Sequence, residues 1–113
     1  MTIYGSFLSF ILMANGFIGL TVFSLSQCVG FDLEGIYTLG RDGRLSLIQI
    51  SDDKNVWLID MVALKQTIPK SLAKWLRSEK CCKFIHDSRQ DQDALYHCHD
   101  IELGGIFDTT VWC

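Results

Sequence analysis

The hydrophobic pattern of the chain changes near residue 28. The stretch from Phe7 to Leu25 is uncharged and mostly apolar, and it is long enough to cross a bilayer as a helix. No Lys or Arg precedes it to give an orientation, and several Ser, Thr and Asn residues interrupt it. Two interpretations of residues 1–27 therefore stay open, a membrane helix or signal and a poorly specified segment packed on the domain. Residues 28–113 are assigned to one small domain.

After residue 28, short apolar runs alternate with polar turns. The runs predict strands over 29–35, 45–50 and 56–59, separated by a Gly-Arg-Asp-Gly turn at 40–43 and a polar turn at 51–55. Three strands joined by two short turns form an antiparallel meander. The second run is mostly apolar, so we expect it to be covered on both faces.

The second half of the chain alternates helices and strands. Pro69 precedes a predicted helix over 70–79, and further helix and strand patterns follow at 83–86 (strand), 88–99 (helix) and 105–107 (strand). A helix between two strands predicts a crossover and a parallel strand pair. On the first helix we expect Leu72, Trp75 and Leu76 to be buried and Lys70, Lys74 and Arg77 to form a solvated basic face. On the second we expect a cap at Asp87 or Ser88, Asp91 in the first turn, and an inner stripe of Ala94, Leu95 and Cys98.

Charge and cysteine content narrow the class of protein. The net charge is −3 with a pI of about 5.4, which argues against broad, charge-driven nucleic-acid binding but not against a small metal-mediated site. The five cysteines are odd in number and show no Cys-x-x-Cys spacing. They favour reduced thiols in an intracellular protein of the cytoplasm or nucleus, with membrane anchoring through residues 1–27 as the open alternative.

Two carboxylates at the end of the first strand are the main chemical candidates. Strand alternation sends Val29, Phe31 and Leu33 to one face and Asp32 and Glu34 to the other. Neighbouring acids repel each other, and a hard divalent cation such as Mg²⁺ removes that cost. A plain acidic turn is the alternative. The His97-Cys98-His99 run is a weaker candidate, since residues two apart on a helix do not share a face. Cys81-Cys82 has no nearby base and is interpreted as idle or buried thiols.

The order of these motifs resembles the 3′–5′ exonuclease domain of the RNase D and Werner-type group, in the DEDD superfamily with a ribonuclease H-like fold. The resemblance covers roughly 28–113. It rests on Phe-Asp-Leu-Glu-Gly at 31–35, Leu-Ser-Leu-Ile-Gln-Ile at 45–50, Lys-Phe-Ile-His-Asp-Ser-Arg-Gln-Asp at 83–91 and Ile-Phe-Asp-Thr at 106–109. It implies an α/β fold, a ribonuclease H-like mixed sheet in which the antiparallel three-strand meander is followed by parallel β-α-β, incomplete at the C-terminus.

The resemblance also implies a metal-dependent exonuclease. Four acids in the family hold two Mg²⁺ or Mn²⁺ ions that hydrolyse the terminal phosphodiester of a single-stranded RNA or DNA 3′ end. Asp32 and Glu34 match the first motif, and Asp91 matches the second, with Asp87 as its rival and interpreted as a helix cap. Asp108 matches a family position that looks structural, capping the next helix.

The nucleic-acid contacts and the last motif complete this expectation. Gly35 would leave room for the terminal nucleotide, and Arg41 and Arg44 would touch phosphate. No residue matches the family's third motif, a Tyr or His followed by the fourth acid, so we expect a truncated domain with impaired catalysis. The alternative is a catalytically inactive exonuclease-fold module that binds RNA or protein.

Overall fold

The computed structural model describes residues 8–10, 28–40, 43–52 and 56–112, and within them the chain forms one mixed sheet with helices. The strands lie in the order β1-β4-β3-β2-β5-β6. Their bounds are Leu8–Phe10 (β1), Cys28–Gly35 (β2), Leu45–Ser51 (β3), Val56–Asp60 (β4), Cys82–Ile85 (β5) and Ile106–Asp108 (β6). The helices are α2 (Lys70–Arg77), α3 (Arg89–His99) and the short 3-10 helix η1 (Thr109–Trp112).

The predicted meander and crossover are both confirmed. The β2–β3 and β3–β4 pairs are antiparallel, while β5 runs parallel to β2 on one side and to β6 on the other. The helix α3 connects β5 to β6, which makes this parallel pair a β-α-β unit. The α/β, ribonuclease H-like fold class inferred from the resemblance is therefore correct.

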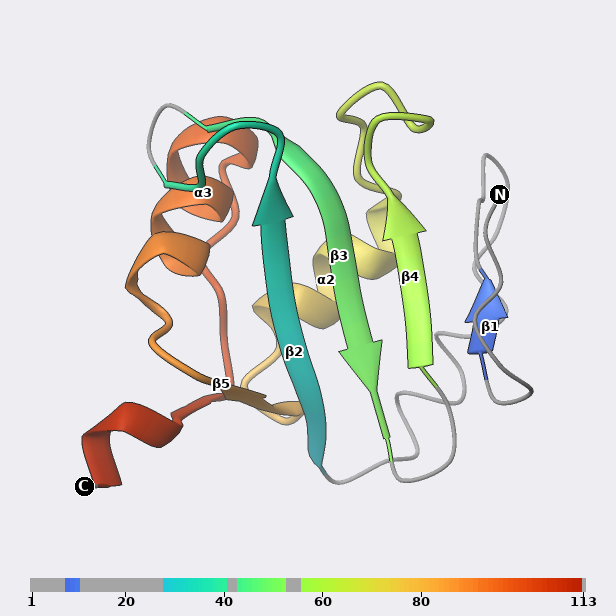
Figure 1. The fold of residues 1–113 in the computed structure, drawn as a ribbon. Helices are drawn as coiled ribbons and strands as arrows, with labels where there is room; N and C mark the ends of the chain where they lie inside the picture. Colours follow the sequence, from blue (N-terminus) through green and yellow to red (C-terminus); the bar gives the residue numbers. More distant parts are fainter. Residues whose placement is uncertain (1–7, 11–27, 41–42, 53–55, 113) are drawn as a thin grey trace.

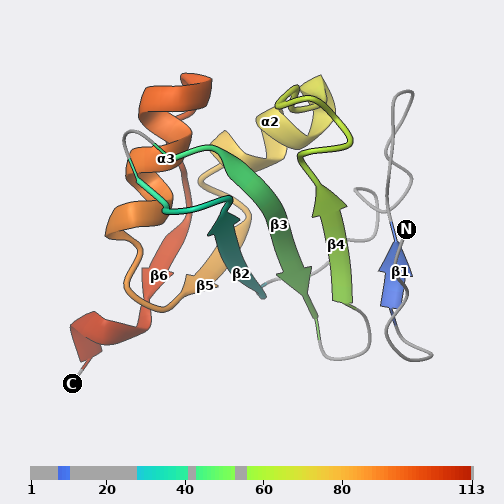
Figure 2. The ribbon, with the colours of Figure 1, turned by 45° about the horizontal axis from the view of Figure 1, so that its top comes forward.

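One face of the sheet carries the core. Val29, Phe31 and Leu33 of β2 are buried together with the apolar stripe of α2, and the Phe31 and Trp75 rings lie 6.2 Å apart. Figures 1 and 2 show α2 and α3 on this side of the sheet. The predicted stripe of Leu72, Trp75 and Leu76 is confirmed. The basic face of α2 is exposed, as expected.

The opposite face of the sheet carries the polar members of the same strands, and we call it the open face. Asp32 and Glu34 are exposed on it, and Gln49 of β3, which pairs with Asp32, is half-buried. Neither α2 nor α3 covers this side (Figure 2). The expectation that β3 would be covered on both faces is wrong for this reason: Ile48 and Ile50 are buried, whereas Leu47 and Gln49 are only partly so.

The N-terminal helix expected over 7–25 can be compared with the structure only at Leu8–Phe10, and there the structure differs. Leu8–Phe10 forms a strand parallel to β4 and not the beginning of a helix. The rest of the predicted helix over 7–25 lies outside the described residues. Among the helices that are described, none has the length and apolarity needed to cross a bilayer.

A buried lysine closes the end of the core between α2 and β5. Lys83 is fully buried, and its Nζ donates to the carbonyl oxygens of Ser78, Cys81 and Gly104 at 3.1, 2.8 and 2.8 Å. The same ammonium lies 4.5 Å from the centre of the Trp75 ring. Burial lowers the pKa of Lys83 to about 8, so it remains charged at neutral pH. Three carbonyl acceptors match the three N–H bonds of an ammonium.

Candidate active site

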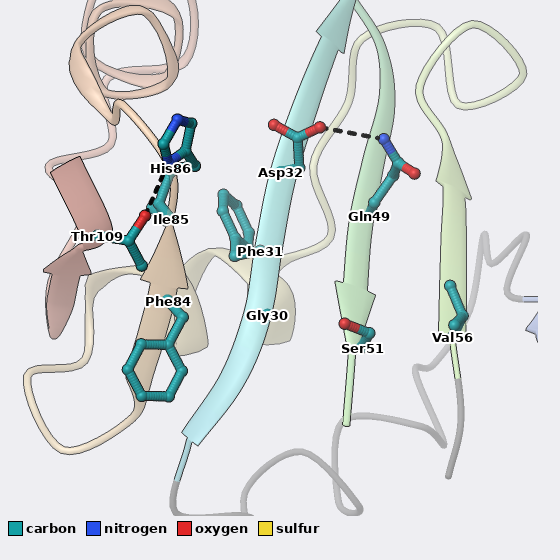
Figure 3. Close-up of a pocket in the computed structure, with 10 residues that line it drawn as sticks. All are labelled: Gly30, Phe31, Asp32, Gln49, Ser51, Val56, Phe84, Ile85, His86 and Thr109. Atoms are coloured by element: carbon teal, nitrogen blue, oxygen red, sulfur yellow. Dashed lines mark hydrogen bonds between the residues drawn. The ribbon is translucent and has the colours of Figure 1, made fainter. Parts of the chain in front are cut away.

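The first two candidate acids lie at the end of β2 on the open face. Asp32 and Glu34 share a partner, since the side-chain amide of Gln49 donates to Asp32 Oδ2 and to Glu34 Oε1, each at 3.4 Å. Figure 3 shows Asp32 turned toward Gln49 across the two strands. Hydrogen bonding with Asp32 is the main cause that raises the pKa of Glu34, followed by desolvation and the charge of Asp32.

The third acid arrives where β5 ends. The pairing of β2 with β5 covers only Cys28 to Gly30, so beyond Gly30 that edge of β2 has no strand beside it. After β5 the chain turns into α3, which places Asp91 in the first turn of the helix next to this edge. Asp91 is 4% exposed and forms a hydrogen bond with the backbone of Leu33. The helix thus brings a carboxylate to the strand that bears the other two.

Asp91 is the most perturbed carboxylate of the group. Burial raises its pKa to about 7, the charges of Asp32 and Glu34 act in the same direction, and the hydrogen bond with Leu33 opposes them. Its Oδ2 atom is buried and has no hydrogen-bond partner. A buried carboxylate with an unpartnered oxygen beside two other acids is unfavourable when ionised, unless a cation is present.

The three acids line one cavity of about 440 Å³, which we call the acidic cavity. Its wall also includes His86, Asp87 and Gln90, from the turn before α3 and from its first residues, and Tyr37, which follows β2. Residues far apart in the sequence therefore meet here, as the resemblance implied for Asp32, Glu34 and Asp91.

The choice of Asp91 over Asp87 agrees with the placement of the two side chains. Asp87 has a positive φ of 54°, and its carboxylate is exposed and pairs with Arg89 at 3.0 Å. This pairing is the main cause that lowers the pKa of Asp87. Asp87 is not the helix cap that was expected. Ser88 is the N-cap residue, and its own side chain makes no capping hydrogen bond to the helix.

Asp108, at the end of β6, instead holds the two residues that precede α3. Asp108 Oδ2 accepts from the N–H and the hydroxyl of Ser88, each at 2.8 Å, and Oδ1 accepts from the N–H of Asp87 at 3.1 Å. Oδ1 also accepts from the N–H and hydroxyl of Thr110 at 3.0 and 2.7 Å. These hydrogen bonds hold the pKa of Asp108 well below its usual range. The structural interpretation of Asp108 as a cap of the next helix is confirmed at η1, and the same carboxylate also fixes the turn before α3.

The predicted nucleic-acid contacts have mixed positions. Gly35 lines the acidic cavity, but the space that a side chain would fill there is taken by the Thr38 carbonyl, so the local backbone alone requires glycine. Arg44 is exposed and lines a neighbouring cavity of about 430 Å³ that shares Tyr37 and Thr38 with the acidic cavity. Arg41 lies outside the described residues.

The donor set at the cavity suits a hard divalent cation. Carboxylate oxygens are the ligands that Mg²⁺ and Mn²⁺ prefer, and the unpartnered Asp91 Oδ2 beside two further acids provides the charge they require. As the side chains stand, no three His, Cys, Asp or Glu groups in the described part of the chain are arranged to coordinate one ion. Asp32 and Glu34 are instead held by Gln49. The residues fit the metal in chemistry, and these two acids would exchange the Gln49 amide for it.

Two residues of the site were not predicted from the sequence. Gln49 is the polar position in an apolar strand, and the antiparallel register with Asp32 was the signal that could have found it. Tyr37 is 99% exposed at the rim of the acidic cavity. Only its position two residues after the Glu-Gly pair pointed to it. Cys98, expected in the inner stripe of α3, is exposed, and its thiol donates to the Gly43 carbonyl.

Comparison with known proteins identifies the family. The family model of the 3′–5′ exonuclease domain matches residues 21–112. The piRNA biogenesis protein EXD1 of Bombyx mori is 30% identical over 74 residues, which are 65% of this chain and 24% of that protein. The Egalitarian protein homolog of Caenorhabditis elegans is 36% identical over 88 residues, 75% of this chain and 15% of that protein. The chain thus spans about a quarter or less of these relatives.

Solved structures agree with the family model. Trypanosoma brucei RNase D in complex with RNA U12 has a TM-score of 0.74 and 25% identity, covering 84% of this chain and 34% of that one. The Aedes aegypti Nibbler EXO domain has a TM-score of 0.78 over 99% of this chain and 57% of its own, and at 17% identity it shows the fold alone. Taken with the match over residues 21–112, these likenesses show that the chain belongs to the 3′–5′ exonuclease domain family.

Proposed function

We propose that Asp32, Glu34 and Asp91 hold Mg²⁺ or Mn²⁺ at the acidic cavity, against the 3′ end of a single-stranded nucleic acid. The observation that carries this proposal is the convergence of β2 and α3, which puts an unpartnered, buried Asp91 oxygen beside two further carboxylates. A structural acid at that position would have its acceptors filled by the protein. Divalent ions bound there would supply an activated water and stabilise the leaving 3′ oxygen.

The surrounding side chains have distinct tasks in this proposal. Asp91 is the fixed ligand, because burial and the helix hold its carboxylate in place. Asp32 and Glu34 are exposed and turn toward the ion when the Gln49 amide releases them. Gln49 then offers its amide as a donor to a phosphate oxygen of the bound strand.

The rim of the cavity suits a single strand. The fully exposed ring of Tyr37 is a platform on which a base stacks, a contact that tolerates any sequence. Arg44, in the cavity next to it, is placed to contact a backbone phosphate. The RNA-bound RNase D neighbour supports RNA as the first substrate to test.

Within the 113 residues, none matches the fourth acid of the family. We therefore propose that this polypeptide binds one ion more readily than two and hydrolyses its substrate slowly. A second candidate function is a non-catalytic module of the same fold that binds RNA. The hydrogen bonds of Gln49 to both Asp32 and Glu34 favour it, because they satisfy these acids without metal.

The test is a nuclease and binding assay on the 113-residue protein. A 5′-labelled single-stranded RNA is incubated with Mg²⁺, Mn²⁺ or chelator, and the DNA of the same sequence is run beside it. Stepwise shortening from the 3′ end that needs metal, is lost in Asp32→Ala and is kept in Asp93→Asn supports the exonuclease. Asp93 is an exposed acid on the same helix as Asp91 and serves as the matched control. RNA retention without shortening, even in Mn²⁺, supports the binding module. If the protein neither shortens nor retains the RNA, both proposed functions are wrong.

A further inference from the structure

Two cysteines face each other across β2 and β5, at the opposite end of β2 from the acids. Cys28 and Cys82 are register partners in the parallel pairing of the two strands. Strand partners at paired positions carry their side chains on the same face, and here it is the open face, since Cys28 alternates with the buried Val29 and Cys82 with the buried Lys83. The two thiols are therefore neighbours.

Their separation suits a covalent bond. Neighbouring strands lie about 4.8 Å apart, and disulfides join Cα atoms at about 4.4–6.8 Å. A side-chain hydrogen bond with Cys28 is the main cause that raises the pKa of Cys82 to about 11. Cys28 is exposed to solvent, whereas Cys82 is half-buried. The pair thus consists of an accessible sulfur and a protonated partner in contact with it.

The other described cysteines are placed differently. Cys81 lies in the bend before β5 and packs against the core. Cys98 lies on α3, where its thiol donates to the Gly43 carbonyl at 3.2 Å. None of the described cysteines forms a disulfide in this structure.

We propose that Cys28 and Cys82 form a reversible disulfide that joins β2 to β5, with hydrogen peroxide as the oxidant. The Cys28 sulfur attacks one peroxide oxygen, the O–O bond breaks, and the leaving hydroxide takes the thiol proton as water. The resulting sulfenic acid is then attacked by the Cys82 sulfur. The S–S bond forms, the S–O bond breaks, and the Cys82 proton leaves with the hydroxide as a second water. A dithiol reductant reverses the change by exchange.

The bond would tie together the two elements that build the acidic cavity. β2 carries Asp32 and Glu34, and β5 leads directly into the helix that carries Asp91. A covalent link at their paired ends limits how far the two can separate. The inference rests on the register, contact and exposure of the two cysteines and is independent of the proposed function.

The test is oxidation of the folded, fully reduced protein with a small excess of hydrogen peroxide. The remaining thiols are blocked and the digest is analysed by mass spectrometry. We expect the loss of two hydrogens from the intact chain and one predominant linked peptide pair containing Cys28 and Cys82, removed again by dithiothreitol. Cys28→Ser and Cys82→Ser should each abolish this link. Cys81→Ser, the matched control one residue away, should form it as the unsubstituted protein does.

Other results would overturn the proposal. A predominant link through Cys81, Cys98 or Cys113 would do so, as would an intramolecular disulfide that persists in Cys82→Ser. Oxidation in denaturant provides the comparison for specificity, because the unfolded chain should give a mixture of pairings. If the folded protein gives the same mixture, or no link at all, the register does not bring the two sulfurs together as proposed.

Discussion

Asp91 and Asp108 lie at the same end of α3 and have opposite environments. Asp108 accepts five hydrogen bonds, from Asp87, Ser88 and Thr110, and they hold its pKa well below the usual range. Asp91 is buried with one oxygen unpartnered, and burial with two neighbouring acids raises its pKa to about 7. Both oxygens of Asp108 are hydrogen-bonded within the fold, whereas one oxygen of Asp91 is not.

The difference separates a structural acid from a functional candidate. A carboxylate whose lone pairs are filled by N–H and O–H donors stabilises the native state when it is ionised. A buried carboxylate near like charges destabilises it, and a bound cation removes the cost. A fully hydrogen-bonded carboxylate therefore fixes the turn before α3, and a buried carboxylate suited to a cation lies in the first turn of the helix.

The largest expected effect comes from removing that defect. Without metal, Asp91→Asn should stabilise the protein at about pH 8, because a pKa of about 7 in place of the ordinary 3.8 corresponds to roughly 4 kcal/mol against folding. The folded state keeps the Asp91 proton until about pH 7, whereas the unfolded state releases it near pH 3.8. Stability of the unsubstituted protein should therefore fall as the pH rises through this window, and the fall should be absent in Asp91→Asn.

Urea denaturation in chelator at about pH 4.5 and about pH 8 measures this slope. Asp93→Asn, on the exposed side of α3, is the control and should behave as the unsubstituted protein. Added Mn²⁺ should stabilise the unsubstituted protein and leave Asp91→Asn unchanged. An equal pH slope in all three proteins would mean that Asp91 is not strained.

The comparison also shows what the sequence could and could not reveal. Alternation along 29–35 predicted which residues of β2 are buried, and the resemblance implied that Asp91 would lie near Asp32 and Glu34, with which it lines the acidic cavity. These features depend on local periodicity and on the order of strands. The role of Asp108 in holding the turn before α3 could not be predicted in the same way, since Asp108 lies 20 residues from Ser88 in sequence. Local signals favoured Asp87 or Ser88 themselves.

The exposure of β3 on the open face could likewise not be predicted from the hydrophobic pattern alone. The apolar run at 45–50 suggested cover on both faces of β3, but the described helices lie only on one. The exposure of Cys98 has a similar origin, because the inner stripe of α3 is narrow and ends with Ala94 and Leu95. Which neighbour lies over a given face depends on the tertiary arrangement and not on the period of the segment.

Lys83 is a second charged group whose hydrogen-bonding groups are all paired within the fold, and its loss should have the next largest effect on stability. Lys83→Met would leave the carbonyls of Ser78, Cys81 and Gly104 without their donor, and we expect a loss of roughly 3 kcal/mol in the free energy of unfolding. Lys80→Met, at an exposed position, is the control. Because burial lowers the pKa of Lys83 to about 8, the unsubstituted protein should gain stability as the pH rises from about 8 toward 10.5, and the Met variant should not. A variant as stable as Lys80→Met would show that these carbonyls find other partners.

Substitution of Tyr37 should weaken binding of a single strand and leave the stability of the protein unchanged. Like Asp91, Tyr37 faces the ligand cavity and is not needed by the fold. Its ring is 99% exposed, so Tyr37→Ala removes no core packing. Loss of one stacked base should weaken single-strand affinity by roughly 1–2 kcal/mol, about tenfold. Fluorescence anisotropy with a labelled RNA measures it, and Tyr37→Phe, which keeps the ring, should bind normally. Equal affinity of the Ala and Phe variants would place the strand elsewhere.

The most selective change is expected at Asp108. Asp108→Asn keeps the size of the side chain but replaces one acceptor oxygen by an NH₂ group, which then faces the donors of either Ser88 or Thr110. The variant should be less stable at neutral pH. The difference should shrink as the pH falls below about 4, because a depressed carboxylate pKa contributes stability above the unfolded value and loses it in acid. Its pH dependence is therefore opposite in sign to that of Asp91. Glu102→Gln, an exposed acid just after α3, should show neither effect. Thermal unfolding of the unsubstituted protein, Asp91→Asn, Asp108→Asn and Glu102→Gln is measured from acid to neutral pH. The two acids would be separated even if every individual shift in Tm were small, since the contributions of Asp108 and Asp91 to stability change with pH in opposite directions.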